Sequence, residues 1–192
     1  LFLSESLSRE KRVEAGRAAD NADIPRIGAR AAIGAAGQAQ ADAFAGKSVA
    51  GEHGRSDPAL AKASAVRESM LATGVDLRHA RDLVSAFRQD SVKGRYANWD
   101  ELMDYCDRSA SPVGRYLLEL HGEDKAGFVQ SDALCNALQV INHLQDCAQD
   151  YANLDRAYQP GDWMAAEGAT LEMLARTESP PKLRRVIARC VE

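Results

Sequence analysis

The near absence of strand-forming segments is the feature that most limits how this chain can fold. Ala, Leu, Glu, Gln, Arg and Lys dominate long stretches, and the few Val and Ile residues recur at helical spacing. Gly, Pro or Asp residues mark short breaks between these stretches. The sequence therefore predicts an all-α protein of about six or seven helices joined by short turns.

Length and charge limit the class of protein. The 192 residues suit a single domain, 1–192, with a sizeable core. The net charge of −4 argues against a protein that binds nucleic acid through bulk positive charge. No apolar run approaches the roughly 18 to 20 residues of a membrane-spanning helix, and the apolar start at residues 1–7 is too short for a signal peptide.

The four cysteines are not arranged as a zinc site, because no pair has CxxC spacing. Without an export signal, we expect reduced thiols in a cytoplasmic protein.

Turn residues divide the chain into predicted helices. Pro25 ends the first, an Ala-rich stretch with few large side chains follows, and Pro58 begins the next. Pro112 either kinks a long helix or begins a new one. The predicted helices cover 4–23, 58–74, 76–94, 98–122, 131–151, a short segment around Met164, and 181–191, whereas the Ala-rich stretch 29–50 is left open between helix and loop.

One face of the segment 134–151 is apolar and predicts contact with the core. At 100° per residue, four side chains fall in a sector about 120° wide. They are Leu134, Leu138, Ile141 and Leu144.

The opposite face of the same segment carries Gln139, Asn142, Asp146 and Asp150, with no Lys or Arg from 134 to 153. The two aspartates, one turn apart, repel each other by a few tenths of a kcal/mol. A divalent cation would offset this repulsion, and Mg²⁺ is commonly held by one or two carboxylates plus substrate phosphates. A solvated acidic face is the equally weighted alternative.

A second carboxylate pair would complete a metal site. Asp20 and Asp23 share a face near the end of the first predicted helix. Aspartates before a proline turn are also common without any metal.

Further polar candidates end the predicted helix 76–94. Asp82 and Asp90 share one face, and three cations suited to phosphate oxygens lie close to Asp90 in the sequence. These are Arg88, Lys93 and Arg95. A polar end to an amphipathic helix explains them equally well.

At these residues the sequence resembles a known family. LQVINHLQDCAQDY followed by DRAYQP is similar to the second aspartate-rich region of squalene and phytoene synthases, with Gln159 where Leu is usual. The segment 82–122 resembles one branch, the bacterial hydroxysqualene synthases of hopanoid biosynthesis. The resemblance extends from about residue 57 to 191. Matching positions in the aspartate-rich region are Gln139, Asn142, Asp146, Asp150, Arg156, Tyr158 and Pro160.

Residues 1–56 diverge from the family, whereas 57–192 match it well. Where the branch reads R-x-A-D-D-I-A-D, this chain has Asn21 for the second Asp and one residue fewer before Asp23. Family members are also longer, so we expect a truncated or divergent member.

The resemblance implies an isoprenoid-synthase-like helical bundle with a central apolar cavity, here lacking the last C-terminal helices. It implies Mg²⁺ as cofactor and a prenyl diphosphate as substrate. The implied metal ligands are Asp146, Asp150, Asp20 and Asp23. Asn142, Gln139, Tyr105 and Asp90 would assist catalysis. The substrate would contact Arg17, Arg88, Lys93, Arg95, Arg156, Tyr158 and Phe87, with Leu138 in the cavity wall.

The implied reaction is that of a hydroxysqualene synthase. Presqualene diphosphate loses its diphosphate, the cation rearranges, and water captures it without NADPH. Two alternatives stay open: a presqualene diphosphate, squalene or phytoene synthase that joins two prenyl diphosphates, and a catalytically inactive family fragment. We expect peripheral contact with the inner face of the membrane and no nucleic-acid partner; the oligomeric state is open.

Overall fold

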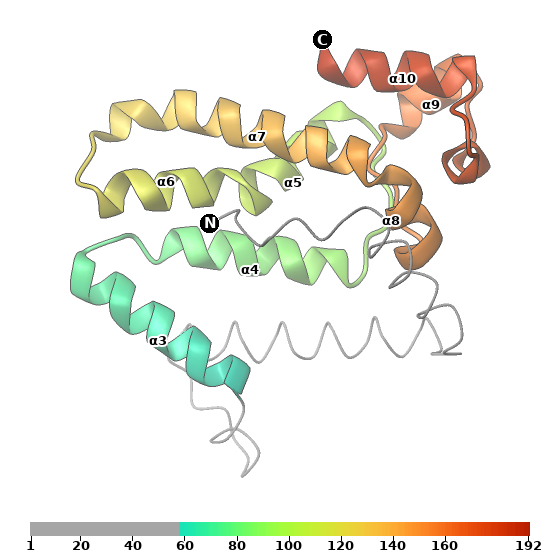
Figure 1. The fold of residues 1–192 in the computed structure, drawn as a ribbon. Coiled ribbons are helices and arrows are strands. Elements are labelled where there is room, and N and C mark those ends of the chain that lie inside the picture. The colour runs from blue at the N-terminus through green and yellow to red at the C-terminus, as the bar shows by residue number, and fades with distance from the viewer. Residues whose placement is uncertain (1–57) are drawn as a thin grey trace, which may run out of the picture.

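The computed structural model describes residues 58–192, and this part of the chain is helical without any strand (Figure 1). The predicted all-α class is confirmed. Its α-helices are α3 (Pro58–Thr73), α4 (Arg78–Asp90), α5 (Trp99–Ser109), α6 (Ser111–Leu120), α7 (Phe128–Gln145), α8 (Cys147–Leu154), α9 (Gly161–Glu167) and α10 (Pro181–Val191). Two 3-10 helices, η2 (Lys125–Gly127) and η3 (Leu171–Ala175), complete the order.

A glycine and an aspartate form the turn between α3 and α4. Gly74 takes φ +75°, a conformation that favours glycine, and Val75 N–H donates to the Met70 carbonyl at 3.0 Å. Asp76 Oδ1 accepts from the N–H of Arg78 at 2.8 Å. This aspartate therefore satisfies a free donor at the start of α4.

Pro112 begins a new helix, which settles the alternative left by the sequence. Helix α5 starts at the cap Asn98, whose Oδ1 accepts from Glu101 N–H at 2.9 Å, and it ends at Ser109. Helix α6 then starts with Pro112 in its first turn, where the missing N–H costs no hydrogen bond.

The single helix predicted over 131–151 is wrong in its boundaries. Helix α7 starts earlier, at Phe128, and the helical run bends at Asp146 before α8. Asp146 has φ −95° and ψ 2°, outside the helical range. The Asp146 N–H still donates to the Asn142 carbonyl, and the Asp150 N–H donates to the Asp146 carbonyl. Asn142, Asp146 and Asp150 therefore stay one helical turn apart through the bend.

Helices α6 and α7 approach closely and lie side by side in Figure 1. A Cβ on Gly114 would fall 2.2 Å from Ser131 Oγ and 2.8 Å from Cys135 Sγ. Arg115 makes a two-pronged ion pair with Asp132, at 2.8 and 2.6 Å. The glycine thus allows the close spacing of α6 and α7, and the ion pair fixes their register.

The prediction that the apolar stripe of 134–151 faces the core holds for Leu144, which packs against the buried cluster around Tyr105, but it is wrong for the other three residues. Leu134, Leu138 and Ile141 are 61%, 52% and 42% exposed, because α5 and α10 pack on the other side of α7, where Val140 and His143 are buried. Helix α6 repeats the same i, i+4, i+7 pattern with three exposed residues. We call these six residues the α6/α7 apolar face: Val113, Leu117, Leu120, Leu134, Leu138 and Ile141.

Within residues 58–192 the core lies elsewhere, and its two larger clusters are as follows. One joins α4, α5, α7 and the segment after α8 around Tyr96, Leu102, Tyr105 and Tyr158. The other joins α9, η3 and α10 around Met164, Leu174, Leu183 and Val186.

The cysteines are free thiols. Burial raises the pKa of Cys106 to about 12 and that of Cys190 to about 11, so both stay protonated at neutral pH. Cys135 and Cys147 are half-buried. Within residues 58–192 we find no helix with the length and hydropathy needed to cross a bilayer.

Candidate functional site

The half-buried carboxylate of Asp90 lies where α4, α5 and the segment after α8 meet. The Tyr105 hydroxyl donates to Asp90 Oδ2 at 3.0 Å. Arg156 Nη2 donates to the Asp90 carbonyl at 2.8 Å, Nη1 lies 3.9 Å from Asp90 Oδ2, and Nη1 also donates to the Tyr158 hydroxyl at 3.3 Å. We call these four residues the Asp90 cluster: Asp90, Tyr105, Arg156 and Tyr158. It joins three segments that are distant in the sequence.

Aromatic packing holds the cluster in place. Tyr158 stacks on His143 with ring centroids 3.5 Å apart and on Tyr96 at 5.5 Å. Tyr105 contacts Tyr96, His143 and Tyr158 in tilted arrangements with centroids 5.4 to 5.9 Å apart. The tyrosine hydroxyls therefore project from a packed wall with little freedom to rotate.

Burial decides the protonation states in this wall. It raises the pKa of Asp90, while Arg156 and the Tyr105 hydrogen bond oppose that rise. Burial also raises the pKa of Tyr105, assisted by Tyr158 and Asp90, so Tyr105 is a neutral phenol that donates. Burial lowers the pKa of His143 to about 4, and Arg156 lowers it further, so this imidazole is uncharged at neutral pH.

The aspartates of the second aspartate-rich region lie beside this cluster. Asp146 is exposed at the bend between α7 and α8, and Asp150 is half-buried one turn later. Burial raises the pKa of Asp150, Asp146 and Asp90 raise it further, and Arg156 lowers it. Asp150 therefore lies within electrostatic reach of Asp146, Asp90 and Arg156.

The two amides of the predicted polar stripe differ in their surroundings. Asn142 is exposed one turn before Asp146. Gln139 is half-buried, and its Nε2 lies 3.2 Å from Nε2 of His143. Gln139 thus orients the imidazole that stacks on Tyr158.

Among the predicted basic residues that lie within 58–192, only one contacts Asp90. Lys93 pairs with Glu101, and Arg95 pairs with Asp155. Arg88 is exposed near the end of α4 and forms no ion pair with another described residue. Arg156 is the cation at the centre of the site.

The remaining predicted residues have the following places. Asp82 pairs with Arg78 at 3.5 Å and lies outside the Asp90 cluster. Phe87 is 53% exposed on α4, and Leu138 belongs to the α6/α7 apolar face. Arg17, Asp20 and Asp23 lie outside the described residues, so their part in the site stays a prediction.

Sequence reasoning missed Tyr96 and His143, which pack against the site tyrosines. A signal for His143 was available, since it is one helical turn after Gln139 on the same segment. No such signal was available for Tyr96, because the loop that carries it has no hydrophobic periodicity.

The donor set suits a metal only in part. Among residues 58–192, no group of three or more acidic, His or Cys side chains is placed to hold a metal ion by itself. Asp146 and Asp150 offer two hard oxygen ligands, as Mg²⁺ prefers when phosphates and waters supply the rest. In addition, Asp90 Oδ1 and Arg156 Nε are buried without a hydrogen bond in the described part. These orphaned atoms fit a further polar group at the site.

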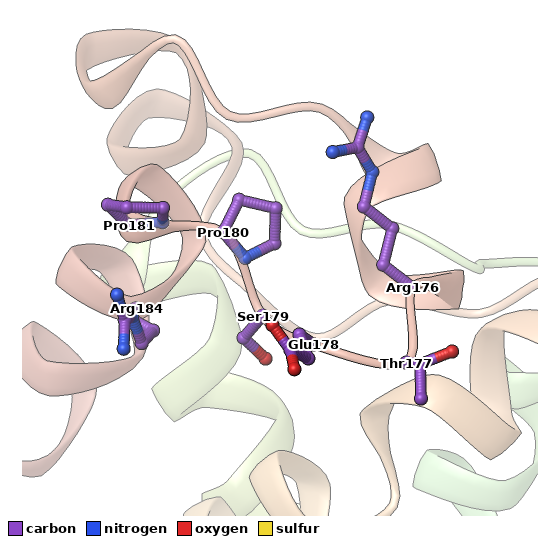
Figure 2. Close-up of a pocket in the computed structure, with 7 residues that line it drawn as sticks. All are labelled: Arg176, Thr177, Glu178, Ser179, Pro180, Pro181 and Arg184. Atoms are coloured by element: carbon purple, nitrogen blue, oxygen red, sulfur yellow. The ribbon is translucent and has the colours of Figure 1, made fainter.

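The hollow formed by residues 176–181 and Arg184 lies apart from this site, because none of the predicted site residues lines it (Figure 2).

Comparison with known proteins identifies the relatives of this site. The family model of squalene/phytoene synthase matches residues 12–192. The hydroxysqualene synthase of Sinorhizobium fredii is 50% identical over 119 residues, 62% of this chain and 41% of the relative. That of Zymomonas mobilis is 49% identical over 124 residues, 64% of this chain and 42% of the relative. The 15-cis-phytoene synthase of Enterobacter agglomerans is 33% identical over 137 residues, 71% of this chain and 45% of the relative.

A solved structure supports the same relationship. The squalene synthase HpnC from Alicyclobacillus acidocaldarius matches 89% of this chain and 60% of its own length, with a TM-score of 0.63 and 33% identity. The chain spans about two fifths of the curated relatives it matches. Helical fold and matched sequence agree, and the chain belongs to the squalene/phytoene synthase family.

Proposed function

We propose that this chain carries the diphosphate-binding part of a Mg²⁺-dependent hydroxysqualene synthase. The observation that carries the proposal is the position of Asp146 and Asp150 at the α7–α8 bend, beside the buried Asp90 cluster. Identity near 50% to hydroxysqualene synthases, against 33% to a phytoene synthase, favours this reaction over the joining of two prenyl diphosphates.

Presqualene diphosphate, the proposed substrate, has a charged head and a long hydrocarbon part. The α6/α7 apolar face offers six large side chains that can cover the hydrocarbon, and burying them stabilises the complex by removing apolar surface from water. Part of this face lies on α7, the helix that ends next to Asp146.

Asp146 and Asp150 would hold Mg²⁺, with Asn142 one turn earlier as a supporting polar group. Mg²⁺, when bound, stabilises the negative charge on the departing diphosphate. The buried Nε–H of Arg156 has no acceptor among the described residues and can donate to a diphosphate oxygen.

The packed tyrosine wall has a separate task. The rings of Tyr105 and Tyr158 are 3% and 5% exposed and pack on Tyr96 and His143, so they would form a dry, rigid backing to the site. His143 behind them is neutral, so it adds no opposing positive charge. The wall also limits the entry of water, which would capture the cation only after its rearrangement.

Turnover distinguishes the proposal from its alternatives. The chain is incubated with Mg²⁺ and either presqualene diphosphate or farnesyl diphosphate, and the lipid products are analysed by mass spectrometry. Hydroxysqualene from presqualene diphosphate supports the proposal. A C30 product from farnesyl diphosphate alone would establish a condensing synthase instead.

Binding is measured separately by calorimetry, with a non-ionisable farnesyl diphosphate analogue and Mg²⁺. Asp146→Ala should reduce binding at least tenfold, whereas Asp100→Ala, an exposed aspartate on α5, should not. Absence of binding by the unaltered chain would favour the inactive-fragment alternative.

A further inference from the structure

The outer side of the last helix concentrates positive charge in an otherwise acidic chain. Residues 176–192 hold five of the 24 basic residues but only two of the 28 acidic ones. Helix α10 buries Leu183 and Val186 against the second core cluster. Its basic residues, Lys182, Arg184, Arg185 and Arg189, lie on the remaining side.

Few of these cations are neutralised. Arg185 pairs with Glu167. Lys182, Arg184 and Arg176 are exposed and form no ion pair with another described residue. Figure 2 shows Arg176 and Arg184 on either side of Pro180, around the hollow before α10. We call Arg176, Lys182, Arg184, Arg185 and Arg189 the α10 basic surface.

Aromatic side chains adjoin the α10 basic surface. The Arg189 guanidinium lies 4.0 Å from the ring centroid of Trp163, which stacks on Trp99 at 5.1 Å. Both tryptophans are half-buried, and Val191 at the end of α10 is 64% exposed. Cations beside tryptophan and exposed aliphatic groups are typical of a surface that rests on lipid headgroups.

We propose that the α10 basic surface docks on an anionic phospholipid bilayer. Charge complementarity favours an anionic partner, since clusters of four to eight Lys and Arg on an amphipathic helix bind acidic lipids. A flat bilayer meets this side of the molecule alone, whereas a nucleic acid wrapped further around the chain would meet its acidic remainder. The inference rests on charge and does not depend on the proposed enzymatic function.

The test is vesicle sedimentation without Mg²⁺ or any prenyl ligand, so that its outcome is independent of the proposed catalytic site. Phosphatidylcholine vesicles are compared with vesicles containing 30% phosphatidylglycerol, as the chosen composition, at low and at high salt. We expect binding to the anionic vesicles only, and its loss at high salt, because these charges are screened.

Two charge-reversal variants of equal net charge localise the contact. Lys182→Glu/Arg184→Glu should lower the vesicle partition coefficient about thirtyfold or more. Each cation removed lowers the coefficient by roughly tenfold or less, and each new glutamate adds repulsion from the anionic lipids. Lys62→Glu/Arg81→Glu, exposed residues on α3 and α4, should lose clearly less. Circular dichroism confirms that both variants are folded.

Three results would overturn the proposal: equal binding to neutral and anionic vesicles, equal loss in both variants, or no vesicle binding by the unaltered chain. Salt-sensitive binding to an oligonucleotide or to polyglutamate in place of vesicles would assign the surface to another anionic partner and would also overturn it.

Discussion

The Tyr105 hydroxyl donates a 3.0 Å hydrogen bond to Asp90 Oδ2, joining α5 to the end of α4. This bond supplies one of the few donors to a half-buried carboxylate whose other oxygen, Oδ1, is buried and has no partner in the described part. Removing the hydroxyl leaves the carboxylate less satisfied. Tyr105→Phe should lower the free energy of unfolding by about 1 to 3 kcal/mol.

Chemical denaturation of Tyr105→Phe and of a matched variant checks this expectation. Tyr116 is half-buried, and its hydroxyl has no hydrogen bond with another described residue, so Tyr116→Phe should change stability by less than about 0.5 kcal/mol. Equal losses in the two variants would show that the Asp90 contact contributes nothing.

Asp150 is destabilising when it is ionised, because burial, Asp146 and Asp90 all raise its pKa. For a carboxyl group with a raised folded-state pKa, its contribution to stability is present at low pH and is lost as pH rises. Asp150→Asn should therefore raise the free energy of unfolding at pH 7 by a few tenths of a kcal/mol. The gain should disappear when the solution is acidified below the usual pKa of aspartate.

Mg²⁺ should reverse the order of stability, so that the unaltered chain becomes more stable than Asp150→Asn. If Asp146 and Asp150 hold Mg²⁺, adding it raises the unfolding temperature of the unaltered chain but not that of Asp150→Asn. Asp100→Asn serves as the control and should keep the Mg²⁺ response. A response of equal size in Asp150→Asn would remove this residue from the proposed metal site.

The sequence predicted most of the helices of the described part but not their exposure. Pro58 and Pro181 begin helices as expected, since proline fits the first helical turn. The face of α7 with Leu134 and Leu138 was assigned to the core, because periodicity identifies an apolar face without showing what covers it. Among the residues that the structure describes, that face of α6 and α7 is exposed.

The candidate site could be predicted where it is local and not where it depends on distant contacts. Asp146 and Asp150 lie one turn apart on a recognisable segment, so their spacing indicated a shared role. The bend at Asp146 and the ion pair between Arg95 and Asp155 depend on tertiary structure. No local pattern in the sequence encodes either feature.

His143 should make stability sensitive to mild acid. Its pKa is lowered to about 4 in the folded chain, against about 6.5 in an unfolded one. A neutral buried histidine contributes stability above pH 6.5, and this is lost as pH falls towards 4. The loss should reach up to about 3 kcal/mol over that interval, since one pKa unit corresponds to about 1.4 kcal/mol.

Denaturation curves between pH 7 and 4 test this. His143→Phe keeps a ring against Tyr158 but cannot be protonated, so its stability should fall less over the same interval. A change at the exposed His121, His121→Asn, should leave the pH dependence of the unaltered chain in place. Parallel curves for all three proteins would contradict the assignment to His143.

Gln159 is 3% exposed, and neither its Oε1 nor its Nε2 has a hydrogen bond in the described part. A buried amide without partners loses its hydration and gains nothing in return, at a cost of about 1 to 3 kcal/mol. Leucine has a similar size and no polar atoms. Gln159→Leu should therefore raise the free energy of unfolding by about 1 to 2 kcal/mol, as measured by chemical denaturation.

The control is Gln130→Leu on the exposed side of α7, where the amide is already hydrated and the change should be within about 0.5 kcal/mol. A clear loss of stability in Gln159→Leu would mean that the amide has partners, such as an ordered water or a residue outside 58–192. The same variant also separates stability from function. If Gln159 acts only through packing, diphosphate-analogue binding should be unchanged while the unfolding midpoint rises.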